Sequence, residues 1–104
     1  MCIEKTERGF AILRFEDSYG ISCSLQKSSI ATRDSIWLGV DDPNPKILAN
    51  LAEKFGIYTK QKVGWIEYPI PKEVSLITRM HLNREQVTQL IPVLQKFVDT
   101  GELE

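Results

Sequence analysis

The sequence has few of the residues that build metal centres and disulfide frameworks. Only Cys2 and Cys23 are cysteines among 104 residues, and His81 is the single histidine. Two cysteines are too few for a disulfide framework in a domain of this size. The zinc spacings CxxC and HExxH do not occur. We therefore expect no metal site and no bound cofactor, and we expect Cys23 to pack as a small apolar side chain.

An excess of charge of one sign is also missing. The formal net charge is −1, so no global field draws the chain toward nucleic acid or an anionic membrane. No apolar run approaches the about 20 residues that span a bilayer. Residues 1–8 carry no apolar segment of the kind found in signal peptides. We expect a cytoplasmic protein that acts on neither membranes nor nucleic acid.

The composition that remains is that of an ordinary globular protein. Hydrophobic residues make up 42% of the chain and charged residues 26%, which lets a chain of this length bury one core. Neither an internal repeat nor a Gly/Ser-rich linker divides it. We therefore expect a single domain, 1–104, in which residues 1–8 form a flexible N-terminal segment.

Alternating apolar residues predict strands in several segments. Residues 9–16 and 21–26 alternate, and residues 17–20 between them have the composition of a turn, so the three predict a β-hairpin. Residues 35–40 (SIWLGV) are nearly all apolar, which predicts a central strand. Residues 73–82 alternate again and predict a further strand.

Helical spacing appears in two segments. The first is predicted to begin at Asn44 as N-cap and to end at Gly56. The second is predicted to begin at Asn83, with Gln86 completing a capping box, and to end at Gly101. The apolar stripe of this second helix consists of Val87, Leu90, Ile91, Leu94, Phe97 and Val98.

These elements together predict an α+β fold. We expect a small, mostly antiparallel sheet of about four to five strands, with two helices packed on one face. The C-terminal helix is expected to be the longer one and to dock its apolar stripe on the sheet. Extended structure is expected around Gly64.

A run of polar side chains, in residues 22–32 (SCSLQKSSIAT), offers a first candidate site. Its hydroxyl and amide groups lie next to a cation, a combination that suits a polar or phosphorylated small molecule. A solvated strand face followed by an ordinary loop would have the same composition, and the sequence leaves both interpretations open.

Arg79 and His81 share one face of the strand predicted over 73–82. Arginine offers a planar fork for phosphate or carboxylate, and histidine adds a second donor. The ordinary alternative is an arginine in solvent and a histidine near a strand end. Spacing fixes no nucleophile beside His81, so we assign no catalytic residue. The candidate ligand-binding residues are Gln26, Lys27, Ser28, Ser29, Arg79 and His81.

Residues 8–39 and 78–103 resemble a family of small uncharacterised proteins encoded by tailed phages and prophages. The specific motifs are SLQKSS, IWLG and TRMHL, the last followed by the C-terminal helix. The resemblance implies work inside an infected bacterium, where a small accessory protein can block or sequester a component of host defence. It implies a setting, and it implies no reaction.

Three functions remain as hypotheses. The first is a non-enzymatic binding module of phage origin that captures a small polar ligand, such as a nucleotide signal of host defence. The second is a protein–protein inhibitor or adaptor that acts on a host protein without a small molecule. The third, ranked last, is an enzyme on a phosphorylated substrate with His81 as acid/base. We also expect a homo-oligomer, a dimer in the first instance, because two Trp and three Tyr are hard to bury in so small a chain.

Overall fold

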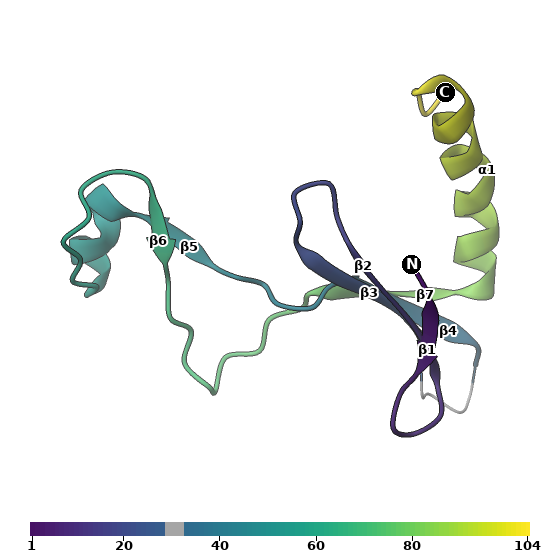
Figure 1. Cartoon of the computed structure of the whole chain (residues 1–104), viewed down its shortest axis with the longest axis horizontal. Coiled ribbons are helices and arrows are strands. Elements are labelled where there is room, and N and C mark those ends of the chain that lie inside the picture. The colour runs from purple at the N-terminus through teal and green to yellow at the C-terminus, as the bar shows by residue number, and fades with distance from the viewer. Residues whose placement is uncertain (29–32) are drawn as a thin grey trace. The chain divides into compact units, whose positions relative to one another are not determined.

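The computed structural model describes residues 1–28 and 33–104 and divides the chain into two compact units (Figure 1). Unit 1 comprises Met1–Asp41 and Thr78–Glu104, and unit 2 comprises Asp42–Ile77. In the described residues unit 1 holds a five-stranded sheet and unit 2 a two-stranded one. None of the helices in these residues has both the length and the apolar composition that crossing a bilayer requires.

The sheet of unit 1 is antiparallel throughout. Its strands are β1 (Ile3–Lys5), β2 (Ala11–Glu16), β3 (Ser22–Lys27), β4 (Ser35–Val40) and β7 (Arg79–Asn83). They lie side by side in the order β1-β2-β3-β4-β7. The α+β class with an antiparallel sheet, predicted from the sequence, is therefore confirmed.

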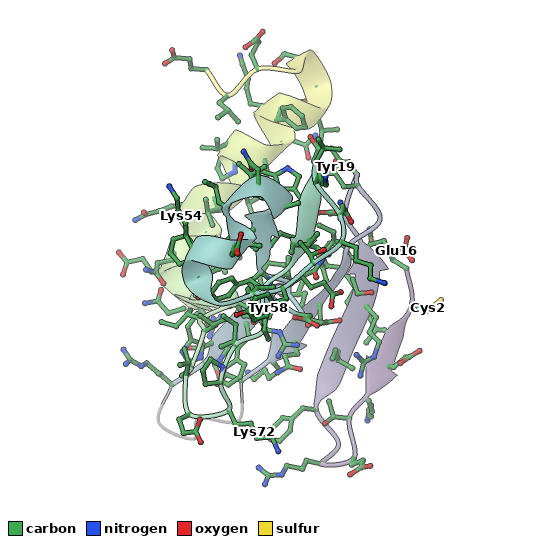
Figure 2. The ribbon with its side chains drawn as sticks, turned by 90° about the vertical axis from the view of Figure 1, so that its left-hand side faces the viewer. Cys2, Glu16, Tyr19, Lys54, Tyr58 and Lys72 are labelled. Atoms are coloured by element: carbon green, nitrogen blue, oxygen red, sulfur yellow. The ribbon has the colours of Figure 1, made fainter. Side chains whose placement is uncertain are left out.

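The predicted hairpin is formed by β2 and β3. The Asp17 carboxylate accepts hydrogen bonds from the backbone N–H groups of Tyr19, at 2.8 Å, and Ile21, at 2.9 Å. Gly20 supplies the positive φ that the turn needs. The Tyr19 side chain is exposed at the turn (Figure 2). The sequence signal for this turn was sufficient because every group that forms it is local.

The N-terminal residues and the cysteines complete this part of the sheet. The segment 1–8 is expected to be flexible, but within it β1 pairs with β2. With three residues, β1 is too short to show a periodic pattern in the sequence. Cys2 is exposed (Figure 2) and Cys23 is buried. Cys23 therefore packs as a small apolar side chain, as expected.

The register gives the sheet a polar and an apolar face, since residues directly opposite each other on antiparallel strands share a face. The polar face consists of the row Ile12, Gln26, Trp37, His81 and the row Arg14, Ser24, Gly39, Arg79. The apolar face consists of Leu13, Phe15, Cys23, Leu25, Ile36, Leu38, Val40, Met80 and Leu82. Lys27 lies on the apolar side, at the margin of the sheet.

Helix α1 (Arg84–Thr100) has the ends that the sequence predicts. Asn83 Oδ1 accepts the Gln86 N–H at 2.9 Å, and Gln86 Oε1 accepts the Asn83 N–H at 3.0 Å, which completes a capping box. Gly101 closes the helix in the left-handed conformation, with its N–H donated to the Phe97 carbonyl.

The expected docking of α1 on its own sheet does not occur. None of the side chains of α1 is buried, and the helix stands away from the strands (Figure 1). The physical reason lies at the junction, because Asn83 is both the last residue of β7 and the N-cap of α1. No loop residues are left with which the helix could turn back over the strand that it follows.

Unit 2 combines a short sheet with a 3-10 helix. Its strands β5 (Lys46–Leu48) and β6 (Trp65–Glu67) pair antiparallel, and the 3-10 helix η1 (Ala49–Phe55) follows β5 directly. The helix ends at Gly56, as predicted, with the glycine in the left-handed conformation. The extended structure expected around Gly64 is present as β6, which follows it.

The predicted start of the first helix at Asn44 is wrong. Asn44 adopts a φ of 46°, and its N–H donates to the Asp42 carboxylate at 2.9 Å. Residues 46–48 are extended because they pair with β6, and this tertiary pairing outweighs the local helical signal. The segment 73–82 also becomes a strand only from Arg79, because its partner β4 ends at Val40.

Candidate ligand-binding site

Trp37 lies at the centre of the polar face. The register places it between Gln26 on β3 and His81 on β7. The Trp37 and His81 rings meet edge to face, with centroids 5.3 Å apart and planes at 86°. Trp37 remains partly exposed. An indole flanked by an amide and an imidazole offers one aromatic surface and several hydrogen-bonding groups to a heterocyclic ligand.

A hollow of about 470 Å³ lies beside this row. That volume is within the range of small-molecule sites. Strands β2, β3 and β4 contribute Arg14, Gln26, Lys27 and Trp37 to its lining, Ser28 follows β3, and the turn between β1 and β2 contributes Arg8 and its neighbours. The turn is held in place by paired backbone hydrogen bonds between Thr6 and Phe10 and between Gly9 and Thr6. We refer to this cavity as the Trp37 hollow.

Arg14, Arg8 and Lys27 give the Trp37 hollow an excess of positive charge over its one lining carboxylate, Glu7. Arg14 Nε lies 3.6 Å from Glu4 Oε2, and both side chains are more than half exposed. An exposed ion pair of this length contributes little to stability. The Arg14 guanidinium can therefore exchange this contact for the stronger paired hydrogen bonds that a phosphate accepts.

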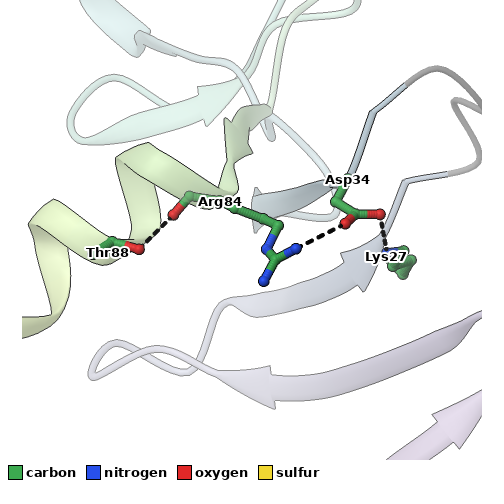
Figure 3. Close-up of polar contacts among 4 residues, drawn as sticks. All are labelled: Lys27, Asp34, Arg84 and Thr88. Atoms are coloured by element: carbon green, nitrogen blue, oxygen red, sulfur yellow. Dashed lines mark hydrogen bonds and ion pairs between the residues drawn. The ribbon is translucent and has the colours of Figure 1, made fainter.

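Lys27 and Ser28 have different surroundings. Lys27 Nζ donates to Asp34 Oδ1 at 3.1 Å, and Arg84 approaches the other oxygen of Asp34 at 3.5 Å (Figure 3). The Lys27 hydrogen bond is the main cause that lowers the pKa of Asp34. Lys27 thus pairs with a carboxylate that does not line the Trp37 hollow, although Lys27 itself is part of that lining. Ser28 is buried, and its N–H donates to the Ser35 carbonyl at 2.9 Å.

Arg79 is held by an internal partner. Its Nη2 donates to Asp41 Oδ1 at 2.8 Å. Arg79 lies in the row of Ser24, two strands away from β3. Ser28 lies four residues further along the chain from Ser24. Strand dimensions then separate the Cα atoms of Arg79 and Ser28 by about 16 Å. The structure therefore does not bring Arg79 to Ser28, although it places Arg79 in the row of Ser24.

The predicted site is thus divided. The structure brings Gln26 and His81 into one row and places Ser28 in the lining of the hollow beside them. It pairs Lys27, which also lines the hollow, with Asp34, and it pairs Arg79 with Asp41 outside the hollow. Ser29 lies outside the described residues.

Sequence reasoning missed Trp37, Arg14 and Arg8. Residues 35–40 were interpreted as nearly all apolar, although Trp37 alternates with Ile36 and Leu38 and so lies on the polar side. That alternation was the available signal for Trp37. The position of Arg8 depends on the pairing of β1 with β2, and β1 is too short to show a periodic pattern.

The described residues hold no group of three or more His, Cys, Asp or Glu side chains that could bind a metal ion. Comparison of the chain with protein-family models, with curated proteins and with solved structures found no match.

Proposed function

We propose that this chain is a non-enzymatic binding protein that captures a small phosphorylated ligand of nucleotide type in the Trp37 hollow. The observation that carries the proposal is the position of a partly exposed indole, an amide and two guanidinium groups around one cavity. An aromatic face stacks on a base, with about 1–3 kcal/mol per base in single-strand binders. Guanidinium groups hold phosphate, and the Gln26 amide fixes orientation by donating and accepting hydrogen bonds.

The surroundings of His81 favour capture over turnover. Its ring packs against Trp37. General acid/base catalysis needs an orienting partner and a nucleophile within hydrogen-bond reach. The contact with Trp37 supplies neither of these, and it instead extends the surface that a heterocycle would meet. We therefore rank the enzyme hypothesis below the binding hypothesis.

The resemblance to phage proteins gives this activity a setting. A protein that holds a nucleotide signal without converting it would lower the free concentration of that signal in the cytoplasm of an infected cell. Such sequestration is stoichiometric, so it needs affinity and abundance and it needs no catalytic group. Counter-defence of this kind is the role that we propose.

Isothermal titration calorimetry tests the proposal with ATP, AMP, cyclic AMP, a cyclic dinucleotide and inorganic phosphate as probes. We expect saturable binding of at least one nucleotide, a melting point that rises with ligand concentration, and chromatographic recovery of the unchanged nucleotide. Recovery of a converted product would support an enzyme instead. A heat signal equal to that of buffer for every probe would contradict capture at this hollow.

Charge-matched variants locate the binding site. Arg14→Gln should weaken nucleotide binding by about ten- to one-hundredfold, since one charge-assisted contact to phosphate is worth about 1.5–3 kcal/mol. Lys96→Gln removes the same charge from an exposed position on α1 and should leave the affinity unchanged. Equal affinity of both variants would move the ligand away from the Trp37 hollow.

A further inference from the structure

The chain exposes more surface than a folded chain of its mass. Its accessible surface is 8917 Å². A single globular protein of 11.9 kDa exposes about 5,900 Å². Two separate globular proteins with the sizes of unit 1 and unit 2 together expose about 7,100 Å². The excess over the larger value is about 1,800 Å² per chain. Each subunit of an obligate homodimer buries an area of that order.

Part of this excess is the apolar stripe of α1. Ile91 is 58% exposed, Leu94 56%, Phe97 54% and Val98 74%. These residues repeat along one side of the helix, so they form a continuous apolar patch rather than scattered single side chains. A patch of this kind on a soluble chain marks an interaction surface.

The apolar face of the sheet is a second uncovered surface in the same unit. Met80 is 54% exposed, and Leu25 and Leu38 in the middle of the sheet are only partly buried. A hollow of about 360 Å³ lies where this face meets α1, and Ile36, Leu82 and Val87 line it together with polar neighbours. Apolar side chains of the sheet and of the first turn of α1 therefore meet at this hollow.

One chain cannot join its two apolar surfaces, because β7 runs into α1 at Asn83 without a loop. A second copy carries both surfaces and has no such restriction. A two-fold axis makes the contact self-complementary, since each copy supplies one helix and one sheet. The formal net charge of −1 per chain opposes this pairing little.

We propose that the chain forms a two-fold homodimer in which α1 of each copy lays its apolar stripe on the apolar face of the other copy's sheet. The presence of both complementary surfaces on every chain argues for a second copy as the occupant, and the excess exposed area, to which unit 2 also contributes, is large enough for such a contact. The polar face with the Trp37 hollow stays outside this contact. The dimer therefore does not depend on the proposed ligand, and either proposal can fail without the other.

Sedimentation equilibrium of the full chain at 10 µM tests the assembly. We expect twice the chain mass for the wild type and for Ile77→Glu, which changes an apolar residue that is 95% exposed in unit 2. Leu94→Glu/Val98→Glu should weaken dimerisation at least tenfold and retain its helical circular dichroism, because neither side chain is buried within its own chain. A monomeric wild type would overturn the proposal, and the apolar stripe of α1 would then be a binding surface for a different protein. An unweakened dimer of the double variant would overturn it too.

Nuclear magnetic resonance tests the arrangement of the two copies. In an equimolar mixture of isotope-labelled and unlabelled chain, nuclear Overhauser effects filtered between the labels should connect Leu94 and Val98 methyl groups to Leu25, Leu38 or Met80. Effects that connect only methyl groups of the two α1 stripes would mean that the two helices pack against each other. The proposed packing of α1 on the other copy's sheet would then be wrong.

Discussion

Arg79 donates to Asp41 through Nη2, 2.8 Å from Oδ1, and this pair joins the start of β7 to the residue that follows β4. The two side chains are 27% and 28% exposed. The pair lies at one end of the polar face and fixes the strand that carries His81. We therefore infer a structural role for this pair, neither member of which lines the Trp37 hollow.

Replacing Arg79 tests this assignment. Arg79→Ala should lower the free energy of unfolding by about 1–3 kcal/mol, because it leaves the Asp41 carboxylate partly buried without its donor. Urea denaturation measures the change, and a cycle with Asp41→Asn should show coupling between the two positions. Ligand affinity of the folded variant should change by less than about threefold. Loss of ligand affinity at unchanged stability would instead place Arg79 in the binding site.

The same pair gives stability a dependence on pH. The hydrogen bond from Arg79 is the main cause that lowers the pKa of Asp41. A carboxyl whose folded pKa lies below its unfolded pKa contributes stability that is fully present above the unfolded pKa, about 3.9. That stability is lost as pH falls through the folded pKa.

We therefore expect the urea midpoint of the wild type to fall between about pH 5 and pH 2, and to fall less steeply in Asp41→Asn. Asp34, whose pKa is also lowered, accounts for part of the remaining slope, so Asp34→Asn is the comparison variant. The same steepness in the wild type and in Asp41→Asn would show that this carboxyl does not carry the effect.

Gly39 is required by the close approach of β7. A Cβ atom at this position would lie 2.2 Å from the Thr78 carbonyl oxygen and 2.8 Å from Arg79 Cα. Both atoms belong to the backbone, so β7 would have to move. Gly39→Ala should cost about 1–3 kcal/mol or more and should speed hydrogen exchange of the Val40 N–H, which donates to Thr78. An unchanged midpoint with unchanged exchange would contradict this account.

The elements that the sequence predicted well carry their own local signals. The β2–β3 turn is made by Asp17 and Gly20, and α1 is bounded by Asn83 and Gly101, so neighbours in sequence supply the hydrogen bonds. The start of the first helix failed because residues 46–48 take their partner from β6, which is distant in sequence. The stripe of α1 was predicted, but its exposure was not. Periodicity shows which residues are apolar and does not show what covers them.

For the candidate site, too, the sequence predicts what depends on neighbouring residues and does not predict contacts between distant ones. Alternation correctly placed Arg79 and His81 on one face. The partner of Arg79, Asp41, lies 38 residues away in sequence, and no local pattern reveals that pairing. Trp37 was hidden because its strand reads as apolar, and only the register with β3 places it beside Gln26.

The most direct test of the binding proposal compares the two tryptophans. Trp37→Leu removes the indole of the hollow, whereas Trp65→Leu removes one that is 64% exposed on β6. In Trp65→Leu protein the remaining tryptophan is Trp37, so its fluorescence reports on the hollow alone. Calorimetric titration with the nucleotide that binds best measures both affinities.

We expect Trp37→Leu to weaken nucleotide affinity about tenfold, as the loss of one stacking contact implies. We expect Trp65→Leu to keep wild-type affinity, and nucleotide should change the fluorescence of this variant. Both variants should keep the far-ultraviolet circular dichroism of the wild type. Wild-type affinity in Trp37→Leu, together with no fluorescence change in Trp65→Leu, would contradict the account.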